Sequence, residues 1–271
     1  MNNMRKIFFR NLFQFTFLFL TFNFYSQHTT INPKTTEKYP APGKHKIMLI
    51  PFEPHLYNSE IDFYINKETK LSAKQIKFAF RDGVNEQLFK SLKTKHNVID
   101  LMDDTVKTKK DLESIYQNLG YEYQKVPDQA NYTPPKKEKD DPKIEKGQIV
   151  VETNADARFM NAKVKNATLV PYLYGKYKSD IFIFINQLDI KASGSTGPAE
   201  LGTNSGNRKI VVHYTVYTFD AKEINSGIAQ EEFPTTINNP AKIVATYFTK
   251  IAQTIVQRIN LALNPTPVQP K

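Results

Sequence analysis

The chain has 271 residues, a formal net charge of +10 and no cysteine. Without cysteine it can form no disulfide, no thiol nucleophile and no cysteine-based zinc or iron–sulfur site. Its length suffices for one large domain or two small ones. Because the lysines are spread along the chain, we expect the positive charge mainly to keep the surface soluble.

The first 26 residues predict a secretory signal peptide. Arg5, Lys6 and Arg10 precede an apolar stretch over residues 12–25, and Ser26 is a small residue at which cleavage is expected. The stretch is shorter than the ~20 residues that cross a bilayer as a helix. An uncleaved N-terminal anchor is the alternative. Both interpretations export the domain, most simply to the periplasm and otherwise out of the cell, and no later segment is apolar enough to span a membrane.

The first half of the domain predicts alternating strands and helices. Residues 27–45 are polar and proline-containing, which favours an extended linker, and residues 46–52 are a continuous apolar run typical of a strand buried on both faces. A long connection over residues 53–71 follows. Ser72 is a suitable N-cap for an amphipathic helix. Apolar residues recur every four positions in that helix: Ile76, Phe80, Val84, Leu88 and Leu92.

The middle of the chain is less regular. Residues 97–101 predict a second strand and residues 111–119 a second helix. Residues 121–146 are rich in proline and charge, which predicts a disordered insertion. Residues 155–178 are expected to form a helix or a helical hairpin, divided near residues 166–168.

The second half predicts three strands and a long helix. Residues 179–190 form the clearest strand, and residues 208–220 and 223–233 alternate as an antiparallel pair after a loop over residues 192–207. A helix begins near Pro240 and carries an apolar stripe to Leu263, before a proline-rich tail over residues 264–271. This order predicts one α/β domain over residues 46–263, with helices packed on a mixed sheet. An α+β arrangement is the alternative.

No motif for catalysis, a cofactor or a metal is recognisable. The five histidines lack the spacing of metal ligands, and His213 is expected to be a partly buried strand residue. The glycine- and serine-rich residues 193–197 precede no helix, which a phosphate cradle requires. We therefore expect a protein without cofactor or metal that is not an enzyme. An exported chain is also a poor candidate for binding nucleic acid.

Two features are candidates for binding a partner. Ligands of open α/β sheets bind at the carboxyl edge of the strands. One candidate is the loop that leaves the first strand there, and the other is the point at which the strand over residues 179–190 turns polar. The predicted site residues are Glu53, His55, Tyr57, Glu60, Asp62, Asn186 and Gln187. The alternative is a capped loop and a strand end whose polar groups are satisfied internally.

The element order resembles a known group of periplasmic domains. The first strand has the pattern I-x-L-I-P-F over residues 47–52. With the order of elements over residues 46–263, it resembles the α/β domain shared by the TolB N-terminal domain, CsgG and LpoB. The connection over residues 53–71 and the insertion over residues 121–146 depart from that group. The resemblance implies a non-enzymatic scaffold that contacts other envelope proteins during assembly, secretion or wall synthesis.

Two other functions remain open at this stage. One is an envelope hydrolase whose carboxylates are brought together only by the fold. The other is a basic protein that binds anionic lipid or wall polymer.

Overall fold

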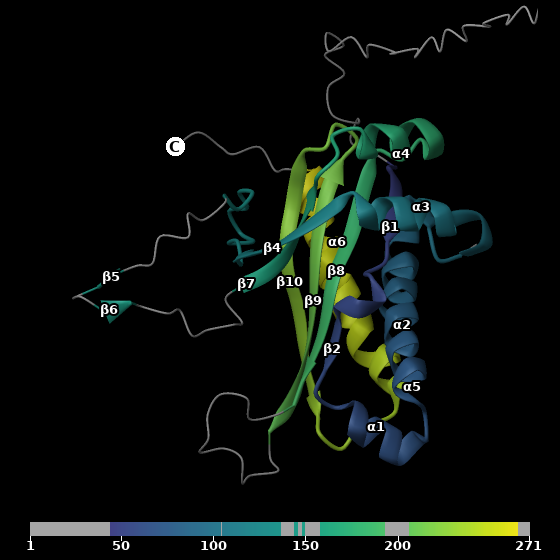
Figure 1. Cartoon of the computed structure of the whole chain (residues 1–271), viewed down its shortest axis with the longest axis vertical. Coiled ribbons are helices and arrows are strands. Elements are labelled where there is room, and N and C mark those ends of the chain that lie inside the picture. The colour runs from purple at the N-terminus through teal and green to yellow at the C-terminus, as the bar shows by residue number, and fades with distance from the viewer. Residues whose placement is uncertain are drawn as a thin grey trace, which may run out of the picture. The chain divides into compact units, whose positions relative to one another are not determined.

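The computed structural model describes residues 44–103, 105–136, 144–145, 148–149, 158–192 and 206–264 (Figure 1). All of them belong to one compact unit, Tyr39–Lys271. The predicted signal peptide, almost all of the linker and the tail beyond residue 264 lie outside the described residues.

A mixed sheet forms the centre of this unit. Its strands, in spatial order, are β10 (Glu223–Pro234), β9 (Asn207–Thr218), β8 (Ile181–Lys191), β1 (Lys46–Ile50) and β3 (Asn97–Asp100). β1 pairs in parallel with β3 and with the first half of β8, whereas β8, β9 and β10 pair antiparallel. The short strand β2 (Tyr57–Ser59) pairs in parallel with the second half of β8. The predicted α/β class and the antiparallel hairpin are confirmed.

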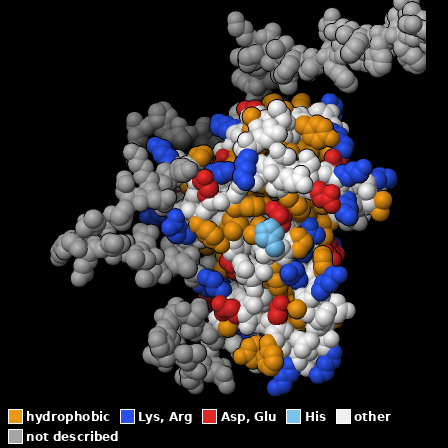
Figure 2. Space-filling view, in the orientation of Figure 1, with side chains coloured by type: hydrophobic (Ala, Val, Ile, Leu, Met, Phe, Trp, Pro, Cys, Tyr) orange, Lys and Arg blue, Asp and Glu red, His pale blue; other side chains and the backbone are white. Residues whose placement is uncertain are grey.

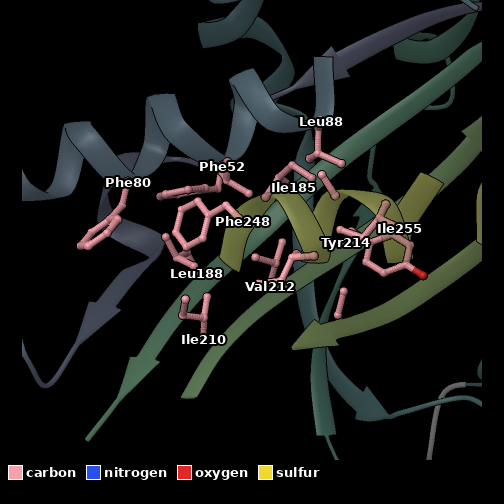
Figure 3. Close-up of a cluster of buried hydrophobic side chains, with 14 of the residues drawn as sticks. Phe52, Phe80, Leu88, Ile185, Leu188, Ile210, Val212, Tyr214, Phe248 and Ile255 are labelled. Atoms are coloured by element: carbon pink, nitrogen blue, oxygen red, sulfur yellow. The ribbon is translucent and has the colours of Figure 1, made fainter. Parts of the chain in front are cut away.

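Helices cover both faces of the sheet. One face carries α1 (Asp62–Thr69), α2 (Ala73–Lys93), α5 (Pro240–Ile243), the π-helix η3 (Val244–Phe248) and α6 (Thr249–Leu263). The other carries α3 (Thr105–Gln117) and α4 (Leu169–Tyr177). Figure 3 shows Phe80 and Leu88 of α2 and Ile255 of α6 pointing toward the apolar side chains of β8 and β9.

The predicted first and last helices of the domain therefore cover the sheet together. The helix that follows Ser72 begins with a capping box: the Gln75 amide donates to Ser72 Oγ at 3.3 Å, and the Ser72 amide donates to Gln75 Oε1 at 2.9 Å. Gly83 of α2 faces the helical layer, where a Cβ atom would lie 2.4 Å from Val244 Cγ2.

One β-bulge in β8 determines which side chains face which layer. The register with β9 shifts between Ile185 and Gln187. Ile183 and Ile185 face α2 and α6 before the shift, and Leu188 still does so after it. The extra residue thus keeps the apolar side chains on one face. It also turns Asn186 and Gln187 toward the opposite layer.

The helix or helical hairpin predicted over residues 155–178 is wrong in its first part. Residues 158–164 form a strand, β7 (Arg158–Val164), which pairs antiparallel with β4 (Leu119–Lys125), and only α4 is helical. Tertiary contacts select the strand. The backbone amides of Met160 and Ala162 donate to His213 Nδ1 at 2.9 Å and to Thr215 Oγ1 at 3.1 Å, so β9 satisfies backbone groups of β7 through its side chains.

The predicted insertion over residues 121–146 begins with ordered structure. Its first residues belong to β4, and the segment that follows lies against β10. There Gln129 Nε2 donates to the Ser226 carbonyl at 2.8 Å, and the Tyr132 hydroxyl donates to Glu223 Oε1 at 2.9 Å. Two short strands, β5 (Ile144–Glu145) and β6 (Gln148–Ile149), pair with each other. Residues 137–143 and 146–147 lie outside the described part of the chain.

Two further predicted boundaries differ from the structure. The connection over residues 53–71 contains a 3₁₀-helix η1 (Pro54–Leu56), β2 and α1. The second helix begins earlier than predicted, because α3 spans Thr105–Gln117. The structure thereby adds a strand beside β8 where a loop was expected, and this strand forms one wall of the site described next.

Candidate functional site

A groove of about 700 Å³ lies beside β2 and the second half of β8. Side chains from β2, β4, β7, β8 and β9 line it, and we call it the β2 groove. It lies at the carboxyl end of β8, the edge at which ligands of open α/β sheets bind.

Three of the seven predicted site residues line the β2 groove, namely Tyr57, Glu60 and Gln187. Gln187 accepts a hydrogen bond from the Tyr123 hydroxyl at 2.7 Å, and Glu60 Oε2 accepts one from the backbone amide of Ala192 at 2.8 Å. Each of these two hydrogen bonds joins segments that are far apart in the sequence.

Tyr57 is held by Asp62, another predicted site residue. The Tyr57 hydroxyl donates to Asp62 Oδ1 at 2.6 Å. Burial, with a further contribution from this carboxylate, raises the pKa of Tyr57 well above its usual value. The tyrosine is therefore neutral and acts as a hydrogen-bond donor, and Asp62 itself does not line the groove.

Glu53 and His55 belong to a different cluster, at the end of β1. His55 Nδ1 lies 3.3 Å from Glu53 Oε2, and Glu53 Oε1 accepts from the Tyr121 hydroxyl at 3.2 Å. Arg81 Nε donates to the carbonyl of the neighbouring Phe52 at 2.8 Å. These contacts fix the exit of the chain from β1, and neither predicted residue lines the β2 groove.

Asn186 is buried beneath β7 rather than in the groove. Its Nδ2 donates to the Met160 carbonyl at 2.8 Å and to Thr215 Oγ1 at 2.7 Å. The bulge in β8 makes this side chain a link between the two sheets. The predicted set of seven residues therefore divides into groove residues and residues that hold neighbouring segments together.

His213 and Asp189 are two of the groove residues that the candidate set omits. Met160 donates its amide proton to His213 Nδ1, so the neutral imidazole carries its proton on Nε2, which donates to Asp189 Oδ2 at 3.1 Å. Asp189 also accepts from Asn58 Nδ2 at 2.9 Å. Burial acts to raise the pKa of Asp189, but the hydrogen bonds from His213 and Asn58 outweigh it and hold the pKa below its ordinary value.

Only partial signals for these two residues exist in the sequence. His213 was recognisable as a strand residue on the face opposite Val212, and it is indeed buried. Asp189 lies two positions after Gln187, which favours the same face of a strand. The contact between Asp189 of β8 and His213 of β9 depends on the bulge in β8, and no feature of the sequence predicts that bulge.

The imidazole of His213 is engaged on both of its nitrogens by groups of the protein itself. Both nitrogens of His213 are hydrogen-bonded inside the protein, so the imidazole presents no free lone pair to a substrate. Among the described residues, no group of three or more His, Asp or Glu side chains could hold a metal ion. Tyr123, which is 50% exposed, offers an aromatic surface beside Arg158, whose guanidinium donates to the Tyr123 carbonyl at 2.9 Å.

The known structures that resemble this chain do so weakly. No family model matches the chain, and no curated protein matches it. One similar solved structure is a hypothetical protein from Chlamydia trachomatis, with 10% identity and a TM-score of 0.38 over 82% of this chain and 99% of that one. Another is a lipoprotein from Neisseria meningitidis, with 9% identity and a TM-score of 0.33 over 79% and 99%. The site is therefore assigned from its own residues alone.

Within the part of the chain that the structure describes, no helix is both long and apolar enough to cross a membrane.

Proposed function

We propose that this protein is exported and acts without catalysis, as an accessory or scaffold module that binds another envelope protein through the β2 groove. The observation that carries this proposal is the hydrogen bonding of the groove. His213 and Asp189 bond to each other and to the surrounding chain, while Tyr123 and Arg158 line the surface. Tyr and Arg are enriched at protein–protein interfaces.

Export rests on the sequence of the first 26 residues, with their basic start and short apolar core. The resemblance to the periplasmic domains of TolB, CsgG and LpoB supports the same assignment. It points to a role in assembly, secretion or wall synthesis.

The hydrolase alternative receives no support from the candidate carboxylates. Glu60 bonds to a backbone amide of residue 192, Asp62 to Tyr57, and Glu53 to Tyr121. A hydrolase of this type needs two carboxylates facing each other across a substrate, and these three have different partners on different segments.

The polymer-binding alternative would be favoured by a contiguous basic surface. On the face shown in Figure 2, Lys and Arg side chains are scattered and interspersed with Asp and Glu. This mixed pattern is typical of a solubilising surface.

Affinity capture from gently crosslinked envelopes tests the proposal. We compare the tagged protein with its Tyr123→Ala and Tyr172→Ala variants. Tyr172 lies on α4 outside the groove and is 54% exposed, close to the 50% of Tyr123, so it is a matched control. We expect the unaltered protein and Tyr172→Ala to enrich the same one or two envelope proteins, and Tyr123→Ala to lose at least tenfold of that enrichment. Equal capture by all three, or capture of the bait alone, would contradict the proposal.

A further inference from the structure

A second depression, of about 720 Å³, lies at the carboxyl end of β3 beside α2. It shares no lining residue with the β2 groove. The carboxylates of Asp82, Asp100 and Asp103 line it together with the rings of Phe78 and Phe89. A cluster of acidic residues is common on a protein surface, but here a buried polar side chain, Asn85, lies beneath the carboxylates.

Asn85 brings a buried amide with an unpaired oxygen to this depression. Its side chain is 2% exposed and lines the depression, and its Nδ2 donates to Asp100 Oδ2 at 2.6 Å. This bond fixes the orientation of the amide, because the reverse orientation would place two acceptors together. Asn85 Oδ1 is buried and has no hydrogen-bond partner among the described residues. Since an unpaired buried acceptor is costly, the site calls for a donor from outside the chain.

The charges around Asn85 favour a cationic donor, because the carboxylates that line the depression, Asp82, Glu86, Asp100 and Asp103, outnumber the cationic side chains Arg81, Lys90 and Lys93. Burial raises the pKa of Asp82, and so does the neighbouring Asp100, although the Arg81 guanidinium acts in the opposite direction. Arg81 is itself committed to the Phe52 carbonyl and the Tyr116 hydroxyl. Of the other basic residues at the rim, Lys90 pairs with Glu86 at 2.6 Å.

The Phe89 ring, which lines the depression, is in contact with the ammonium group of Lys93. Lys93 Nζ lies 5.3 Å from the centroid of the Phe89 ring, within the range of a cation–π contact. The surface of Phe89 is therefore compatible with an ammonium or a guanidinium group, and the depression extends from this ring to Asp82 and Asp100.

We propose that this depression binds a guanidinium or ammonium group on an aliphatic stem, the chemistry of an arginine or lysine side chain. Asp82 and Asp100 pair with the positive charge, Asn85 Oδ1 accepts one N–H, and Phe89 packs against the stem. Partner proteins and free amines both carry this chemistry, and the experiment below distinguishes the two sources. This assignment stands independently of the β2 groove.

Titration of the ¹⁵N-labelled protein, followed at the Asn85 side-chain amide, tests the assignment. Three compounds are compared: N-acetyl-arginine methylamide, agmatine, and the neutral isostere N-acetyl-citrulline methylamide. We expect saturable shifts from both cations and none from the citrulline compound at equal concentration. Tighter binding of the acetylated arginine indicates a protein-borne side chain, and tighter binding of agmatine indicates a free amine.

An exposed position on α2 provides the variant, and an exposed position on α3 outside the depression provides its control. Asp82→Asn is expected to weaken binding at least fivefold, whereas Glu113→Gln, at a carboxylate that is 58% exposed, is expected to change it less than twofold. The proposal is overturned if citrulline binds as well as arginine, if no compound shifts the resonance, or if Asp82→Asn binds unchanged. A response to Ca²⁺ with none to the amines also overturns it.

Discussion

Asp189 connects the groove to the stability of the fold through its charge. Its pKa lies below that of an unfolded aspartate, because His213 and Asn58 donate to the ionised form. A depressed folded-state pKa contributes stability that is present above the ordinary aspartate value, ~4. That stability is lost as pH falls through the lower folded value.

We therefore predict a pH-dependent effect of Asp189→Asn. The substitution should lower the free energy of unfolding by about 1–2 kcal/mol at pH 6, and the difference from the unaltered protein should shrink below about pH 4. Urea unfolding between pH 3 and 6 measures it. Glu113→Gln, at a carboxylate on α3 that is 58% exposed, serves as the control and should show little difference at any pH. A gap that stays constant down to pH 3 would contradict the assigned role of Asp189.

The sequence predicts groove residues that lie near the end of a strand. It does not predict contacts between side chains that depend on the register of two paired strands. Tyr57, Glu60 and Gln187 were predicted because they lie at the carboxyl end of strands, and they do line one groove. The contact between Asp189 and His213 was not predicted, since the register shift in β8 decides which residues of the two strands face each other.

At the scale of elements, the close approach of α2 to the π-helix η3 depends on one glycine. A Cβ atom at Gly83 would lie 2.4 Å from Val244 Cγ2, whereas a Cβ atom at Gly175 of α4 meets nothing within 4 Å. The two glycines occupy helices, so replacement by alanine gives the same gain in helix propensity, ~1 kcal/mol.

We predict opposite signs for these two substitutions. Gly83→Ala should lower the free energy of unfolding by about 1–3 kcal/mol, because overpacking exceeds the gain in propensity. Gly175→Ala should raise it by up to about 1 kcal/mol. Thermal and urea unfolding measure both. Combining Gly83→Ala with Val244→Ala should recover part of the loss, and two destabilisations that simply add would show that the contact is not the cause.

Helices and strands whose apolar residues recur at a regular spacing were predicted from the sequence. Strands that form because of contacts with neighbouring strands were not. The four-residue spacing of α2 and the alternation of β9 and β10 identify these elements locally. β7 has no such periodic signal in its own sequence. Side chains of β9 accept hydrogen bonds from its backbone amides, and this contact is visible only in the folded chain. β4 was not predicted, because Leu119 was assigned to the helix predicted over residues 111–119 and residues 121–125 begin a polar, proline-rich stretch.

For the molecule as a whole, Thr215 joins the β4–β7 pair to the central sheet. It is fully buried, its Oγ1 accepts from the Ala162 amide and from Asn186 Nδ2, and its hydroxyl donates to Asn161 Oδ1 at 2.6 Å. Side-chain bonds of this kind, with the packing of Leu119 and Ala162 in the core, attach the β4–β7 pair, which is a candidate for opening as a unit.

We predict that Thr215→Val loosens this layer selectively. The substitution should lower the free energy of unfolding by about 2–3 kcal/mol, because it leaves the polar groups that bond to Thr215 Oγ1 unpaired. Amide hydrogen exchange in β4 and β7 should accelerate at least tenfold more than in β8. Thr218→Val is the matched control on the same strand, because the Thr218 hydroxyl bonds to Asp220 and Lys222 in the turn that follows. Equal acceleration in all strands would argue against a separately opening layer.

Site-specific photo-crosslinking in intact envelopes measures directly whether the β2 groove binds a partner protein. A photoreactive phenylalanine analogue replaces exposed Asn58 in the groove or, as a control, Glu113 on α3. We predict one discrete protein adduct from position 58, none from position 113, and loss of the adduct when Tyr123→Ala is added. Export without any adduct at position 58, or the same adducts from both positions, would contradict the account.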